Sequence, residues 1–166
     1  LTFDIAFILS VYLYLFDSDD SISANTIELL ADAAVQKRPD FVIGNYEVTG
    51  ARRWAPPLSL GTGFYEGNAL VLSTYVQGKW YVMAWNKLVS RPLVLQHKLY
   101  FQEGIVHEDD LWSFKLACMS QSMYVVNETT YYYSMQPDSI MRAPSMRNLE
   151  CRVLVLGYIY DFIRSS

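Results

Sequence analysis

Three aspartates at the end of an apolar run are the first residues in this sequence that could do chemistry. Asp17, Asp19 and Asp20 follow residues 11–16, an aromatic and aliphatic run that predicts a buried strand. Carboxylates this close together repel one another unless a cation or hydrogen-bond donors lie beside them. At the carboxyl end of a strand in an α/β sheet, such oxygen ligands suit Mg²⁺ or Mn²⁺, which also bind phosphates. The alternative is a polar turn whose aspartates cap the next helix.

A second acidic cluster, Glu108, Asp109 and Asp110, precedes an apolar helical run over residues 111–119. Acids in the first turn of a helix complement its macrodipole and its free N–H groups, so capping is one explanation. The other explanation is a carboxylate that acts as a general base. In that arrangement the first cluster holds a metal and phosphates, and the second removes a proton from a nucleophile.

The segments around these clusters read as alternating helices and strands. Residues 1–10 are expected to be a short helix or an irregular lead-in. Strands are predicted at 11–16, 40–44 and 80–88, and two strands or a hairpin around residues 127–128. Helices are predicted at about 25–37, 66–75, 108–122 and 144–163, with a short helix that starts at 91–92 and a loop at 50–63.

Composition excludes several classes of protein. The 166 residues fit one domain, and 52% hydrophobic with 18% charged residues indicates a globular chain. A net charge of −4 without a basic run argues against nucleic acid as a partner. Neither a signal peptide nor a membrane-spanning pattern is present, and the two cysteines lack metal-ligand spacing. Reduced thiols in a cytosolic protein are expected.

Five short motifs, in this order, resemble those of bacterial family 2 glycosyltransferases. They are Leu-Phe-Asp-Ser-Asp-Asp at 15–20, Trp-Asn-Lys-Leu at 85–88, Gly-Ile-Val-His-Glu-Asp-Asp-Leu-Trp at 104–112, Tyr-Tyr-Tyr at 131–133 and Ser-Ile-Met-Arg at 139–142. The resemblance implies an α/β fold of the GT-A type, a mixed sheet flanked by helices. It also implies inverting transfer of a sugar from a UDP- or GDP-sugar to a hydroxyl of a saccharide or lipid-linked acceptor. The pathway implied is surface polysaccharide or lipopolysaccharide biosynthesis.

The resemblance assigns roles to the first cluster and to one arginine. Asp17 and Asp19 match the D-x-D motif, which contacts the donor ribose and, through Mn²⁺ or Mg²⁺, its diphosphate. Asp20 is a further candidate metal ligand. Arg142 falls where the family places a basic residue near the leaving pyrophosphate, and a guanidinium suits that charge. A solvated loop charge explains Arg142 equally well.

The remaining roles concern the acceptor. Asp109 matches the acid of the E-D motif, the implied base that deprotonates the acceptor hydroxyl. Glu108 and Asp110 flank it and are candidates to substitute for it or orient it. Trp85 and Asn86 are candidates to line the acceptor side, although a core role explains Trp85 as well.

The chain departs from the family pattern before the D-x-D strand. Only 16 residues precede Asp17, where the family has its nucleotide-binding half. We therefore expect residues 1–166 to form one domain, the C-terminal portion of the catalytic domain, truncated at its N-terminus. Uncovered apolar sheet surface would favour a homo-oligomer.

Two other functions are alternatives to the glycosyltransferase. One is a catalytically inactive GT-A-like binding or interaction module. The other is a metal-dependent phosphohydrolase, which the order of the motifs disfavours. The expected location is the cytoplasm, either free or peripheral at the inner face of the membrane.

Overall fold

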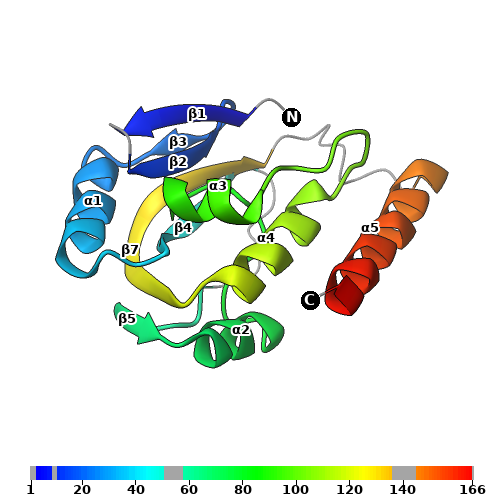
Figure 1. The fold of residues 1–166 in the computed structure, drawn as a ribbon. Coiled ribbons are helices and arrows are strands. Elements are labelled where there is room, and N and C mark those ends of the chain that lie inside the picture. Colours follow the sequence, from blue (N-terminus) through cyan, green and yellow to red (C-terminus); the bar gives the residue numbers. More distant parts are fainter. Residues whose placement is uncertain (1–2, 9–10, 51–57, 136–144, 166) are drawn as a thin grey trace.

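The computed structural model describes residues 3–8, 11–50, 58–135 and 145–165, with side chains from residue 11 onward. A seven-stranded mixed sheet runs through the molecule in the order β1-β2-β6-β4-β7-β3, and β5 pairs with β7 (Figure 1). The strands are β1 (Phe3–Ile8), β2 (Tyr12–Asp17), β3 (Ser21–Ile22), β4 (Phe41–Gly50), β5 (Gly63–Glu66), β6 (Lys87–Ser90) and β7 (Ser122–Met135). The helices are α1 (Thr26–Lys37), α2 (Asn68–Val76), α3 (Arg91–His97), α4 (Glu108–Met119) and α5 (Met146–Ser165). The expected mixed sheet flanked by helices is confirmed.

The long strand β7 replaces the hairpin that the sequence predicted. It pairs in parallel with β4 over most of its length. The register moves from Gly44 opposite Val126 to Asn45 opposite Thr129, so the two residues predicted to turn the chain are absorbed in a bulge. The hairpin prediction was wrong because β4 continues to Gly50 and offers β7 a partner along its whole course.

Two other sequence predictions were also wrong. The lead-in is the strand β1, which pairs antiparallel with β2 from Phe3 opposite Asp17 to Ile8 opposite Tyr12. A short apolar run has no periodicity that separates strand from helix, and the neighbouring strand decides the outcome here. The strand expected at 80–88 is confined to β6, since residues 79–86 form an irregular loop whose aromatic side chains are buried.

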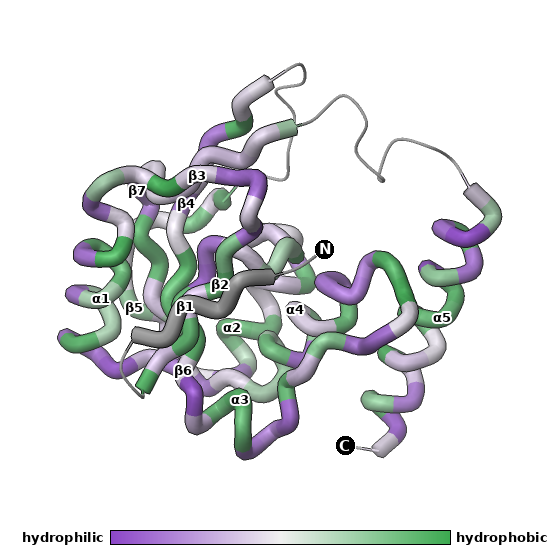
Figure 2. The backbone as a smooth tube through the Cα atoms, turned by 90° about the horizontal axis from the view of Figure 1, so that it is seen from above, coloured by the Kyte–Doolittle hydropathy of each residue, from purple (hydrophilic) through white to green (hydrophobic). Residues whose placement is uncertain are grey.

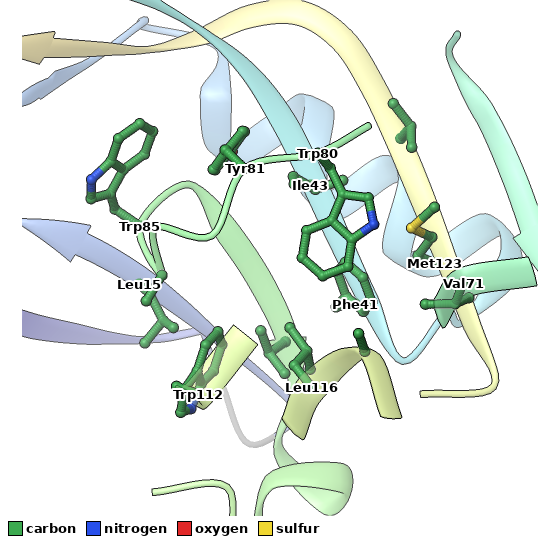
Figure 3. Close-up of a cluster of buried hydrophobic side chains, with 14 of the residues drawn as sticks. Leu15, Phe41, Ile43, Val71, Trp80, Tyr81, Trp85, Trp112, Leu116 and Met123 are labelled. Atoms are coloured by element: carbon green, nitrogen blue, oxygen red, sulfur yellow. The ribbon is translucent and has the colours of Figure 1, made fainter. Parts of the chain in front are cut away.

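Helices cover both faces of the sheet. On one face α1 packs Leu30, Ala33 and Ala34 against the strands. On the other face α2 and α4 cover the larger core, where the Phe41 and Trp80 ring centroids lie 5.5 Å apart (Figure 3). Burying these large aromatic and aliphatic groups supplies most of the favourable free energy of folding.

The last helix, α5, lies beyond α4 at the edge of the molecule in both views (Figures 1 and 2). Its buried residues are Cys151 and Val155, and the Phe162 ring lies edge-on to Phe114 of α4. None of the helices in the described ranges combines the length and hydrophobicity that a membrane crossing requires.

A buried amide joins three strands at the bulge of β4. Asn86, fully buried at a φ of 57°, donates from Nδ2 to the carbonyl oxygen of Asn45 at 3.1 Å. Its Oδ1 accepts from the hydroxyl of Thr130 at 3.0 Å and from that of Tyr14 at 3.3 Å. We call this hydrogen-bonded cluster the Asn86 node. A Cβ on Gly44 would lie 2.0 Å from the Thr130 hydroxyl, so glycine is required there for the node to close.

We therefore expect Gly44→Ala to destabilise the protein by about 2 kcal/mol, because the added methyl group separates β4 from β7. The thermal midpoint should fall by about 6 °C for a domain of this size. Gly61→Ala is the matched control, since a Cβ there meets nothing within 4 Å. Equal midpoints for the two variants would show that the node tolerates the methyl group.

Candidate functional site

The three aspartates predicted from the sequence are brought together at the end of β2. Each offers one carboxylate oxygen, and these oxygens all lie within 4.8 Å of one another. Asp17 is the last residue of β2, and the N–H of Asp20 donates to its carbonyl oxygen at 3.2 Å to close the turn. The turn therefore points three hard oxygen ligands at one place, which suits a divalent cation such as Mg²⁺ or Mn²⁺.

The strand β7 holds this turn in place. The hydroxyl of Tyr131 donates to Asp20 Oδ2 at 2.6 Å and accepts from the backbone N–H of Asp17 at 3.1 Å. The backbone N–H of Ser134 donates to Asp20 Oδ1 at 2.7 Å. Beneath them, the Tyr131 ring is stacked on Trp85 with centroids 4.5 Å apart. Asp20 is thus engaged by two donors of the protein, which fixes the geometry of the cluster.

The carboxylates of this cluster are difficult to ionise together. Partial burial, together with the hydrogen bond and the charge of Asp19, raises the pKa of Asp17 to about 6. Burial also raises the pKa of Asp20, although the donors Tyr131 and Ser134 oppose that rise. A bound cation would relieve the repulsion, so the residues present fit a metal.

The second cluster begins α4, as the sequence predicted. Asp109 is the second residue of that helix, and its carboxylate turns inward to accept a hydrogen bond from the backbone N–H of Ala84. Within the described part of the chain, its Oδ1 is buried without a hydrogen-bond partner. Burial and the neighbouring charge of Glu108 raise the pKa of Asp109 to about 7. A carboxylate poised near neutral pH in this way suits a general base.

Lys87 was not singled out by the sequence analysis, and its charge acts on Asp109. Its side chain is fully buried, and its Nζ donates to the carbonyl oxygens of Tyr81, at 3.2 Å, and Met83. Burial lowers the pKa of Lys87 to about 7, and the negative charge of Asp109 opposes that fall. The available signal was a lysine flanked by apolar residues at 80–85 and 88–89, since a lysine is rarely fully buried unless its charge has partners.

The charges of both clusters act on Tyr133. Burial raises the pKa of its hydroxyl, and the charges of Asp20, Asp19, Asp17 and Asp109 raise it further. Its ring is stacked on Trp85 at 5.2 Å between centroids. Charges of both acidic clusters therefore raise the pKa of one half-buried phenol, and a common crevice for the two clusters stays a prediction.

The other predicted residues lie as follows. Trp85 and Asn86 are 3% and 0% exposed, so both belong to the interior in this structure, and acceptor contact by either stays a prediction. Asp110 is half-buried with a pKa raised by burial, and Glu108 opens α4 beside it. Arg142 lies outside the described residues.

Comparisons with known proteins agree with this picture at low identity. Glycosyltransferase GlyG of Streptococcus pneumoniae serotype 4 is 24% identical over 151 residues, which cover 79% of this chain and 46% of that protein. S. aureus TarS 1–349 in complex with UDP-GlcNAc matches the fold with a TM-score of 0.69, at 17% identity over 89% of this chain and 42% of that one. Its complex with UDP matches with a TM-score of 0.61, at 16% identity over 89% of this chain and 46% of that one.

No family model matches the chain. The chain spans less than half the length of the relatives described above. The sequence is thus glycosyltransferase-like, and the fold is the one that TarS shares.

The raised pKa of Asp17 predicts a pH-dependent cost of folding. A carboxyl whose folded pKa lies above its unfolded value of 3.8 stabilises the protein fully below that value, and the contribution is lost as pH rises through about 6. Asp17→Asn removes this loss. At pH 7 the free energy of unfolding of the variant should therefore exceed that of the parent by about 1 kcal/mol, once solvent screening is allowed for. Thermal midpoints should then differ by about 3 °C at pH 7 and coincide at pH 3.5.

Asp32→Asn, at an exposed position on α1, is the control for this comparison. It should leave the midpoint unchanged at both pH values. A midpoint for Asp17→Asn below that of the parent at pH 7 would contradict a strained cluster.

Proposed function

We propose that the chain is the C-terminal part of the catalytic domain of a family 2, GT-A glycosyltransferase. In this proposal it transfers a sugar with inversion from a nucleotide-sugar to an acceptor hydroxyl, in surface polysaccharide or lipopolysaccharide biosynthesis. One observation carries the proposal: the aspartates at the end of β2 hold carboxylate oxygens within 4.8 Å of one another, an arrangement that suits a divalent cation. The fold that places them is shared with a protein whose structure contains UDP-GlcNAc, which makes UDP-sugars the first donors to test.

The donor belongs at the β2 cluster. Asp17, Asp19 and Asp20 would hold Mn²⁺ or Mg²⁺, whose charge neutralises the diphosphate as it leaves. Asp20 is already fixed by Tyr131 and Ser134, so Asp17 and Asp19 are the carboxylates that adjust to the cation and the donor ribose. Arg142 is proposed to add a positive charge to the same pyrophosphate.

The acceptor hydroxyl loses its proton to Asp109. An inverting transfer needs one carboxylate on the face of the sugar opposite the leaving group, and α4 holds Asp109 with little freedom. The burial that raises its pKa makes it a stronger base than an exposed aspartate. Glu108 and Asp110, next to it on the first turn, are proposed to orient the acceptor or the base.

Donor binding is the first test of this function. With Mn²⁺ and UDP-GlcNAc at about a hundredfold excess over the dissociation constant, the free energy of unfolding should rise by about 2.7 kcal/mol. The thermal midpoint should rise by about 8 °C. Asp19→Ala should abolish the shift because it removes an exposed metal ligand of the cluster. The control Asp32→Ala should keep the full shift. Calorimetry with UDP- and GDP-sugars, with and without Mn²⁺, then identifies the nucleotide.

Asp109→Asn separates the base from the donor site. The variant should bind Mn²⁺ and donor as the parent does but transfer sugar about 10² to 10⁴ times more slowly, because an amide accepts no proton. Asp161→Asn on the exposed face of α5 is the control. Since the chain spans less than half of its relatives, transfer is measured both on this chain and on a longer natural version. Transfer by Asp109→Asn at the parent rate would exclude Asp109 as the base.

A further inference from the structure

The loop that precedes β6 is held from one side by a buried ammonium. The Nζ of Lys87 donates to the carbonyl oxygens of Tyr81 and Met83 and lies 4.3 Å from the centroid of the Tyr81 ring. Residues 81–83 therefore curl around this one side chain. An ammonium that is fully removed from water requires such acceptors, and it is rarely found without an acidic partner.

The same loop is held from the other side by α4. The Ser113 hydroxyl donates to the carbonyl oxygen of Val82, and the N–H of Ala84 donates to the Asp109 carboxylate. Successive residues of this loop thus alternate between hydrogen bonds to Lys87 and hydrogen bonds to α4. Asp109 Oδ1 is nevertheless buried with no hydrogen-bond partner among the described residues. A buried carboxylate left in this state depends on a nearby positive charge.

We propose that Lys87 is a positioning residue for Asp109. Its ammonium stabilises the ionised carboxylate and fixes the loop whose amide orients it. The inference rests on the proposed function only in giving Asp109 the role of base. The interaction of the two side chains can be measured without any turnover.

The charges around the pair explain why the lysine is needed. Burial and the charges of Glu108 and Asp110 favour the protonated form of Asp109, and Lys87 opposes them. Buried groups that interact this closely titrate as a unit. Without the lysine, Asp109 would remain protonated at neutral pH and could not accept a proton. The titratable groups that face the pair from the surrounding elements are Glu108 and Asp110 of α4, Tyr81 of the loop and Tyr133 of β7.

A double-mutant cycle tests the pair through thermal midpoints. Lys87→Met leaves a buried carboxylate uncompensated, so the midpoint should fall by about 10 °C at pH 8. The fall should shrink to about 3 °C at pH 5, where Asp109 takes up a proton. Asp109→Asn should show the opposite trend, because Lys87 is then charged and unpaired at low pH. The fall in thermal midpoint of the double variant should be clearly smaller than the sum of the two single falls, and it should not depend on pH in this way.

Lys98→Met, at an exposed lysine after α3, should shift the midpoint by no more than about 1 °C at either pH. Additive losses that are equal at pH 5 and pH 8 would overturn the proposal. If a single variant does not fold, NMR titration of the Asp109 carboxyl in the parent protein gives the answer. The ammonium of Lys87 is followed in the same titration: a shared titration of the two groups near pH 7 supports the pair, and independent titration of each group rejects it.

The transfer assay then adds a readout that a merely structural lysine would not move. In Lys87→Met the acid limb of the pH–rate profile should shift upward by at least about one unit, because the pKa of Asp109 rises. An unchanged limb in a folded variant would overturn the role of Lys87 in positioning the base. Absence of transfer in the parent protein would reject the proposed function instead, while the double-mutant cycle still tests the pair.

Discussion

The amide of Asn86 is the constraint on which the rest of the structure depends. It is fully buried, so each of its polar atoms must find a partner inside the protein, and the partners come from β2, β4 and β7. The bulge at Gly44 and Asn45 turns the Asn45 carbonyl oxygen toward this amide. Glycine at position 44 leaves room for the Thr130 hydroxyl to approach. Three strands that are distant in sequence therefore meet at one residue with one register.

The neighbours of Asn86 in the chain carry that constraint to both acidic clusters. On one side Trp85 stacks on Tyr131, whose hydroxyl joins Asp20 to the backbone of Asp17. On the other side Lys87 donates to carbonyl oxygens of its own loop, and its charge acts on Asp109. Consecutive residues thus support the end of β2 and the start of α4. A shift of this short segment would disturb both clusters together, which explains why so much aromatic surface is packed around it.

Features set by near neighbours in the sequence could be predicted, and features set by distant ones could not. The strand ending at Asp17 and the helix beginning at Glu108 follow from an apolar run and a change of polarity within a few residues. The unbroken course of β7 depends on a parallel partner some eighty residues away. The local turn signal at Asn127 therefore predicted a break in the strand that the structure does not have. Likewise, the apolar residues around Lys87 indicate that its charge is buried, but they do not reveal which groups receive it, because those groups come from a loop shaped by tertiary packing.

The electrostatics of the two clusters differ from those expected of helix caps. A capping aspartate accepts hydrogen bonds from the first turn of its helix and becomes more acidic as a result. Asp109 does the reverse: its Oδ1 is buried without a hydrogen-bond partner among the described residues, and burial raises its pKa. Asp17 likewise shares its turn with two more acids that make it harder to ionise. Asparagine would form similar turns without this repulsion, so stability alone does not account for the carboxylates. Groups held in an unfavourable state of charge by an otherwise well-packed fold are those that a cation, a donor or a proton can still stabilise.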